Sequence, residues 1–535
     1  MNCSLHSLCT ATSKPPCGYA RGQGKHVKKR AGFALFLVVL SPLIAGCTLR
    51  EDRPSIVTPI PLHWANGANA RPGQGAPDLT TWWHRYHDPI LNHLVETALS
   101  TNAQIDEALQ RVAAARALAR AERVNRLPVL TGRGSLDVTS RLAGDPAGIN
   151  DSIGDPASVT GTVATPPTVG IAEGSLDASW EIDLFGRLSS QAEAAKRNET
   201  SNAADLEAIR ITVIADIVRT YVELRGALRR RAVVRSDIDA RRQLLNIVQD
   251  QLRVGTAGEF DVQRAAATFE ASRARLPPTE FAVRASMQRL ATLTGSPVAD
   301  SALSSVRAQA PVADLPGATL PADVIRLRPD VRRTEEIILQ RAALADVAYA
   351  DLFPRLILAG SLNIQTSVIG LPVIGVPVTV TGGPGISLPV FNWGQRRAVV
   401  DARDAELKEA IATHRRTVLL AVEDVELAAI AVREGARRLQ RLTGAFTAAR
   451  RALTTSDSLY RGGQIGLTER LQAEADLRQA EFERADGEEA YAVAIVTLYR
   501  SLGAGPRRMP SLPAPTAAPP LAASNLAAVM SDGRP

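Results

Sequence analysis

The chain has 535 residues, enough for several ordinary domains, and a formal net charge of +7 at pH 7. Six basic residues and no acidic residue precede Cys47, so the remainder carries a net charge of only +1. This balance gives little electrostatic support for a nucleic-acid partner. Aromatic residues make up only 4% of the chain, while alanine and arginine are abundant, and this composition favours long helices over a compact sandwich.

The N-terminal region is typical of a bacterial secretory signal. A basic stretch, Lys25 to Arg30, precedes the apolar run 31–46, which is too short for a comfortable membrane span. The run leads into Leu43-Ile-Ala-Gly-Cys47, which resembles the bacterial lipobox, whose cysteine is lipidated and becomes the new N-terminus. We therefore expect a signal peptide over 1–46 and lipidation at Cys47. The alternative is an ordinary signal peptide with a chance cysteine.

The remaining cysteines all lie upstream of Cys47, so the mature chain would have neither a disulfide framework nor a thiol nucleophile. Thr48 stands where an aspartate would favour retention at the inner membrane, and this resembles sorting to the outer membrane. Residues 1–24 form an unusually extended region ahead of a signal. A wrongly assigned start codon explains them as well as a function does.

The mature chain contains two copies of one unit. Shifting the sequence by 208 residues superposes Gly186, Gly255 and Gly295 on glycines of the second half, and further upstream a shift of 226 aligns Pro128 with Pro354. The 18-residue difference predicts a longer loop in the first copy, within 141–170. We expect a Pro/Gly-rich leader over 47–81, a first repeat over 82–300, a linker over 301–319, a second repeat over 320–506 and a disordered tail over 507–535.

Each repeat is predicted to run helix, strand pair, long helix, turn and helix. The strands alternate apolar and polar residues over 130–139, 175–184 and 356–365, and more weakly over 386–390, where Pro389 indicates a strand end. Gly382-Gly-Pro-Gly385 is interpreted as a turn, because it lacks the lysine and the helix of a phosphate loop. The polar strand positions are Asp137, Asp177, Ser179, Glu181, Asn363 and Gln365.

The helices are long, since no proline occurs between Arg187 and Leu276 or between Val390 and Gly505. Apolar residues recur at spacings of three and four, as at Ile214, Ile217, Tyr221, Leu224 and Leu228, which is a coiled-coil-like seam. A helix from about Arg187 to about Arg253 would be roughly 100 Å long at 1.5 Å per residue. No globular domain needs such a rod.

Four strands cannot close a barrel in a membrane, because about eight is the minimum and an open edge leaves unpaired backbone groups in lipid. Two copies would supply eight strands, and side chains fill the interior of a barrel of that size. Three copies would supply twelve strands around a water-filled lumen. We therefore expect a mainly α-helical protein with a membrane β-barrel portion, formed by a trimer of duplicated protomers. The six polar strand positions would line the lumen.

Six segments resemble the TolC-type outer-membrane efflux proteins, most closely the lipoprotein branch that serves resistance-nodulation-division pumps. They are Asp88 to Leu99, Trp180 to Arg187, Leu327 to Glu335, Ala350 to Leu356, Leu388 to Gly394 and Leu498 to Gly503. The resemblance implies a homotrimer with a twelve-stranded barrel in the outer membrane and a twelve-helix periplasmic tunnel. It also implies a periplasmic membrane-fusion adaptor, a proton-driven inner-membrane pump and a passive exit duct for drugs or other toxic small molecules or ions.

In this family the two helix-helix turns at the periplasmic tip contact the adaptor. The resemblance places them at Arg253, Gly255 and Gly258 and at Arg461, Gly463 and Gly466, where glycine suits a tight reversal. It also makes Asp261 and Glu469 candidates for an acidic gate, although a second acid found three residues later in some members is Gln472 here. Turns without a partner and a merely solvated Glu469 are the alternatives.

Neither enzyme chemistry nor a cofactor is indicated. His84, His87 and His93 have spacing that could suit a metal, but no cysteine lies near them and no metal site is expected. Arg328-Pro-Asp330 fits the start of a helix, with proline in the first turn. The competing functions are a type I secretion channel of the same fold and a lipid-anchored coiled-coil protein without a pore.

Overall fold

The computed structural model describes residues 60, 64–65, 79–140, 168–305, 321–369 and 377–506. The chain divides into two compact units, Met1–Arg53 and Pro54–Pro535, and every described residue belongs to the second unit. The predicted signal peptide, Cys47, most of the leader, the long loop of the first repeat and the C-terminal tail lie outside the described residues.

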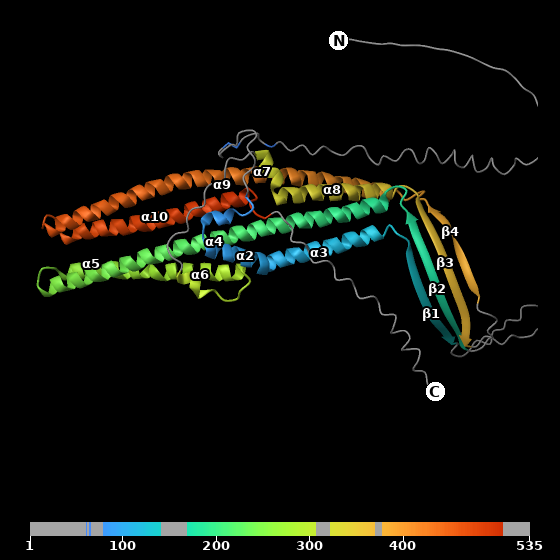
Figure 1. The fold of residues 1–535 in the computed structure, drawn as a ribbon, viewed down its shortest axis with the longest axis horizontal. Coiled ribbons are helices and arrows are strands. Elements are labelled where there is room, and N and C mark those ends of the chain that lie inside the picture. Colours follow the sequence, from blue (N-terminus) through green and yellow to red (C-terminus); the bar gives the residue numbers. More distant parts are fainter. Residues whose placement is uncertain are drawn as a thin grey trace, which may run out of the picture. The chain divides into compact units, whose positions relative to one another are not determined.

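Each repeat follows the predicted order of helix, strand pair, long helix, turn and helix (Figure 1). The elements of the first repeat are η1 (Trp82–Tyr86), α2 (Pro89–Thr101), α3 (Ala103–Val124), β1 (Val129–Ser140), β2 (Thr168–Ile182), α4 (Arg187–Arg253), α5 (Glu259–Ala274) and α6 (Leu276–Leu293). Those that follow are η2 (Ser301–Ser305), α7 (Pro321–Leu327), α8 (Pro329–Ala350), β3 (Arg355–Ile369), β4 (Val378–Ser387), α9 (Gln395–Arg461) and α10 (Leu467–Ser501). Among the described residues, no helix combines the length and the apolar character needed to cross a membrane.

The geometry confirms the duplication. The helices α4 and α9 both have 67 residues and begin 208 positions apart, while α3 and α8 both have 22 residues and begin 226 positions apart. The described glycines with positive φ form three pairs separated by 208 residues: Gly186 with Gly394, Gly255 with Gly463, and Gly295 with Gly503. The two repeats therefore share their helix ends and turns, although their sequences have diverged.

Equivalent residues also begin equivalent helices. Asn102 caps α3, and its side-chain amide donates to the Leu293 carbonyl at 2.8 Å. Its counterpart Arg328 precedes α8 and donates to the Ser501 carbonyl, also at 2.8 Å. Pro329 occupies the first turn of α8, so Arg328-Pro-Asp330 starts a helix as predicted.

The four strands form one antiparallel sheet in the order β1-β2-β3-β4. Directly opposed residues share a face of a sheet, and the register aligns Thr131 with Asp177 and Asp177 with Ser361. All six predicted polar positions therefore lie on one face. The other face presents leucine, valine and isoleucine side chains, with Leu130 65% exposed and Ile386 74% exposed.

The prediction for the fourth strand was wrong. The strand β4 begins at Val378 and ends at Ser387, and the predicted turn Gly382-Gly-Pro-Gly385 is part of it, paired with residues 357–360 of β3. Glycines carry no side chain, so they conceal the alternation that marks a strand. They also permit close approach, because a methyl group on Gly382 would lie 3.3 Å from the Gly360 Cα. Pro384 is tolerated on the outer strand of the sheet.

The second strand also ends earlier than predicted, at Ile182 rather than at residue 184. The cause is Asp183, whose carboxylate accepts hydrogen bonds from the backbone N–H groups of Leu188 and Ser189 at 3.1 and 2.8 Å. These groups belong to the first turn of α4, where helix N–H groups lack partners. Asp183 thus caps the long helix instead of extending the strand.

The hydrophobic core lies where α2, α4, α9 and α10 meet around η1. Trp82 stacks on Tyr499 with ring centroids 4.6 Å apart. The predicted seam residues Ile214, Ile217, Tyr221 and Leu224 of α4 are fully buried there. Packing of this seam, rather than intrinsic helix propensity, stabilises such long helices.

Candidate functional site

The polar face of the sheet is a connected hydrogen-bonding surface. Gln365 donates to Glu173 on the neighbouring strand at 2.7 Å, and the hydroxyl groups of Ser361 and Thr381 lie 2.7 Å apart across β3 and β4. The Arg133 guanidinium lies 3.9 Å from the Asp177 carboxylate. These exposed groups suit contact with water, whereas the exposed leucines, valines and isoleucines on the opposite face suit contact with an apolar medium.

Glu181 differs from the other five positions because it is held at the junction between sheet and helices. It forms an ion pair with Arg187 at 2.7 Å, and this hydrogen bond is the main cause of the raised pKa of Arg187. Asp351 lies 4.0 Å from the same guanidinium and also pairs with Arg355 at 2.6 Å. This network joins the end of β2 to the start of α4, and the end of α8 to the start of β3. It was not predicted from the sequence.

Each long helix begins next to the sheet and ends in a helix-helix hairpin, α4 before α5 and α9 before α10. At the first, Gly255 has φ +76°, its N–H donates to the Leu252 carbonyl at 3.0 Å, and the Thr256 N–H donates to the Gln251 carbonyl at 2.8 Å. At the second, Gly463 has φ +68° and the equivalent bonds run to Tyr460 and Leu459. Both are Schellman turns, which require a residue that accepts the left-handed conformation.

The remaining predicted hairpin residues frame these turns. Gly258 and Gly466 immediately precede α5 and α10 and adopt extended backbone conformations. Arg253 and Arg461 end α4 and α9, and their exposed side chains pair with Asp250 and Asp457 of their own helices. These arginines are therefore placed at the hairpin surface and not in the helix seam.

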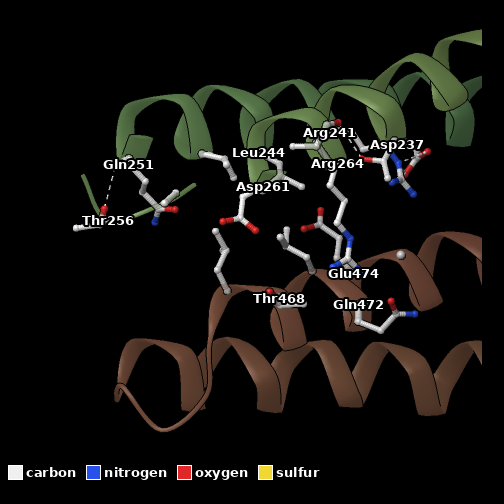
Figure 2. A pocket seen from close by; sticks show the side chains of 18 residues that line it. Asp237, Arg241, Leu244, Gln251, Thr256, Asp261, Arg264, Thr468, Gln472 and Glu474 are labelled. Atoms are coloured by element: carbon white, nitrogen blue, oxygen red, sulfur yellow. Dashed lines mark hydrogen bonds and ion pairs between the residues drawn. The ribbon is translucent and has the colours of Figure 1, made fainter. Parts of the chain in front are cut away.

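A cleft of about 280 Å³ separates the first hairpin from the start of α10. Figure 2 shows Asp261 and Arg264 of α5 pointing towards α10, where Thr468, Gln472 and Glu474 line the opposite wall. The two hairpins are therefore adjacent, and charged residues line the space between them.

The two gate candidates are not brought together. Asp261 lines the cleft and also accepts a hydrogen bond from the Gly258 N–H at 3.1 Å, which caps α5. Glu469 is exposed and is not among the residues that line the cleft. A single protomer therefore presents one gate candidate to the cleft and the other to its surface.

Sequence reasoning missed the acid that faces Asp261 from α10. Glu474 lies 3.1 Å from Arg470, which also pairs with Asp457 at 2.7 Å, and these neighbours raise the pKa of Arg470 against the opposing effect of burial. Asp457 and Glu474 belong to different helices. The sequence indicated only that Arg470 and Glu474, four residues apart on one helix, could form an ion pair.

The three histidines are exposed, with His84 on η1, His87 directly after it and His93 on α2. Over the part of the chain that the structure describes, no group of three or more histidine, cysteine or acidic residues is arranged to hold a metal ion.

Comparisons with known proteins agree with the geometry. A family model described as outer membrane efflux protein matches residues 94–296 and 320–504, one match in each repeat. Nodulation protein T of Rhizobium leguminosarum bv. trifolii is 28% identical over 470 residues, covering 87% of this chain and 96% of that protein. The toluene efflux pump outer membrane protein TtgF of Pseudomonas putida is 28% identical over 403 residues, covering 72% of this chain and 79% of that protein.

The fold is also that of a solved channel. The structure of the outer-membrane channel OprN is similar with a TM-score of 0.70 and 30% sequence identity, and the similarity covers 84% of this chain and 99% of that one. The family model spans most of both repeats and agrees with the predicted resemblance. The chain therefore belongs to the outer membrane efflux protein family, as a channel of the outer membrane and not as an enzyme.

Proposed function

We propose that three copies of this chain form the passive exit duct of a tripartite efflux system. The observation that carries the proposal is the sheet, which has four strands, a polar face and an exposed apolar face, with β1 and β4 as its outer strands. An unpaired edge in lipid leaves backbone groups unsatisfied, at several kcal/mol each. Joining the outer strands of three copies removes every edge and gives twelve strands around a water-filled lumen.

In this assembly the hydrogen-bonded polar face lines the lumen. Asp137, Asp177, Ser179, Asn363 and Gln365 face water there, while Glu181 stays in the ion-pair network where the sheet meets the helices. The apolar face contacts lipid. The helices of the three copies continue the lumen as a tunnel, since a helix of 67 residues is about 100 Å long.

The two hairpins dock a periplasmic membrane-fusion adaptor. Their glycines have open space around them, because a methyl group on Gly255 or Gly463 would meet no other atom within 4 Å. Val254 and Phe260 beside the first hairpin are 74% and 75% exposed, and exposed apolar side chains at a loop tip support a protein contact. Arg253 and Arg461 add exposed charge to the same surface.

Asp261 and Glu469 supply the acidic groups of the closed tip, and Cys47 carries the lipid that anchors the chain to the outer membrane. The resemblance of the lipobox-like segment and of Leu327-Arg-Pro-Asp330 to the lipoprotein branch supports an inner-membrane pump of the resistance-nodulation-division class. The cargo is drugs or other toxic small molecules or ions, with selection made mainly by the pump.

The test is conductance of the purified, detergent-extracted protein in planar bilayers. A water-filled duct gives stable steps that are lost when the trimer is dissociated, whereas trimers that never conduct would refute the duct. Asp177→Asn removes a charge from the polar face and should lower the preference for cations. Ala178→Ser alters the neighbouring residue on the opposite face and should leave ion selectivity unchanged.

A further inference from the structure

The two repeats share one strand register. Val129 of β1 is opposite Ser179 of β2. Adding 226 to the first number and 208 to the second gives Arg355 and Ser387, which are opposite each other in β3 and β4. The offsets found in the helices therefore also hold within the sheet, residue by residue.

The joint between the repeats is the contact of β2 with β3, in which Ala178 lies opposite Gly360. The outer strand β4 is the counterpart of β2, and the outer strand β1 is the counterpart of β3. We propose that neighbouring copies of the chain repeat this internal joint, so that β4 of one copy pairs with β1 of the next and Ile386 lies opposite Gly134. This inference rests on the proposed trimer and specifies the contacts within it.

The side chains at this register fit each other. On the apolar face Ile386 falls opposite Gly134, and Leu388, just after the strand, falls opposite Gly132. A large residue thus meets a glycine twice. There is room beside both glycines, since the closest atom to a methyl group would be a backbone oxygen at 3.9 Å for Gly134 and, for Gly132, the Leu176 Cδ1 and a backbone oxygen at 4.0 Å. The exposed Ile386 and Leu388 side chains pack against the neighbouring backbone at these glycines, and their outer sides contact lipid.

The helices supply an ion pair with exchanged charges. Within the chain, Arg332 of α8 pairs with Glu207 of α4 at 2.5 Å. The counterpart of Glu207 on α9 is Arg415, and the counterpart of Arg332 on α3 is Asp106; both are exposed. Within the chain the acid is on the long helix and the base is on the short helix. At the counterpart positions the base is on the long helix and the acid is on the short helix. Arg415 of one copy pairs with Asp106 of the next.

A second pair keeps its sign. Arg229 of α4 pairs with Glu488 of α10 at 2.6 Å within the chain. Their counterparts are Arg437 of α9 and Glu280 of α6, whose side chains are 68% and 34% exposed and pair with Glu434 and Arg235 of their own copy. Two positions far apart on α9 thus meet complementary charges in the neighbouring copy, and this arrangement favours one register and opposes slippage.

Cysteine cross-linking measures the strand register directly. The sequence from residue 48 to residue 535 contains no cysteine, so introduced pairs report alone. Ile386→Cys combined with Gly134→Cys should give covalently linked dimers and trimers under mild oxidation, because directly opposed residues approach within disulfide distance. The matched controls combine Ile386→Cys with Gly132→Cys or with Leu136→Cys, two residues away on the same face, and should cross-link at least several-fold less.

The outcomes separate the inference from the proposed function. Trimers that cross-link best at residue 132 or 136 would overturn the register and leave the duct intact. A protein that forms no trimers at all would overturn the proposed function itself.

Charge exchange tests the helix contact. Arg415→Glu and Asp106→Arg should each lower the fraction of trimer that survives detergent dilution, and the double variant should restore it. The control is Arg450→Glu, the same change on the same helix, whose counterpart Arg242 pairs with Asp239 of its own helix. It should leave the trimer fraction unchanged. Two single losses without restoration in the double variant would refute the pair.

Discussion

Replacing Gly463 by alanine should destabilise the second hairpin, even though there is room for a side chain. The φ of +68° at Gly463 lies in the left-handed region, where an L-residue costs about 1–2 kcal/mol. A methyl group would meet no atom within 4 Å, so the cost is conformational and not steric. Gly463→Ala should therefore destabilise the second hairpin by about 1–2 kcal/mol and accelerate its amide exchange by about 5- to 30-fold.

The matched control is Gly444→Ala. Gly444 lies in the interior of α9, and a methyl group there would also meet no atom within 4 Å. Alanine in a helix interior is favoured over glycine by about 0.5–1 kcal/mol, so the same substitution should slow exchange there. Hydrogen exchange with peptide-level mass spectrometry compares the two sites. Acceleration at both sites, or unchanged exchange at the hairpin, would show that the left-handed conformation at Gly463 does not control the stability of the hairpin.

Arg328→Ala removes buried hydrogen bonds to the Ala421 and Ser501 carbonyls and should destabilise the fold by about 2–4 kcal/mol, with a lower thermal midpoint than Arg328→Lys. Burial lowers the pKa of His414, so the folded state binds fewer protons and stability should fall as the pH drops below about 6.5. The double variant His414→Leu with Thr334→Ala carries the residues found at the equivalent positions of the first repeat, Leu206 and Ala108. Its thermal midpoint should depend less on pH across this range. Glu469→Ala should weaken divalent-cation block of single-channel conductance, and an unchanged block would remove Glu469 from the gate. Cys47→Ser should abolish metabolic labelling with fatty acid while trimers still form.

The helices and the duplication were predictable because their signals are repeated many times. The seam of α4 recurs over several turns, and a constant offset of 208 is confirmed by turn glycines as far apart as Gly186 and Gly295. A single local departure cannot hide such patterns. The limits of α4 were therefore predicted well from the absence of proline and from the glycines beside it.

The errors lie where one residue or one contact decides the outcome. The glycines of β4 have no side chains to alternate, so its first part resembled a turn. Asp183 continued the alternation of β2 and yet caps α4 through two backbone N–H groups. Alternation alone does not show whether such a residue extends the strand or caps the helix. That depends on where the backbone turns between β2 and α4.

The candidate site divides in the same way. The hairpin glycines follow from local backbone geometry and were predicted individually, as Gly255 and Gly463 show. The facing of Asp261 and Glu474 across the cleft depends on how α5 and α10 lie beside each other, which is a tertiary property. Local patterns therefore located the hairpins but not the charges that the hairpins bring together.

Native mass spectrometry of the mature protein, extracted from outer membranes in detergent, measures how many copies form the channel. Three copies per particle are expected, because neighbouring copies complete the pairing of β1 and β4. A stable monomer that stays in solution without detergent once the lipid is removed would contradict this expectation.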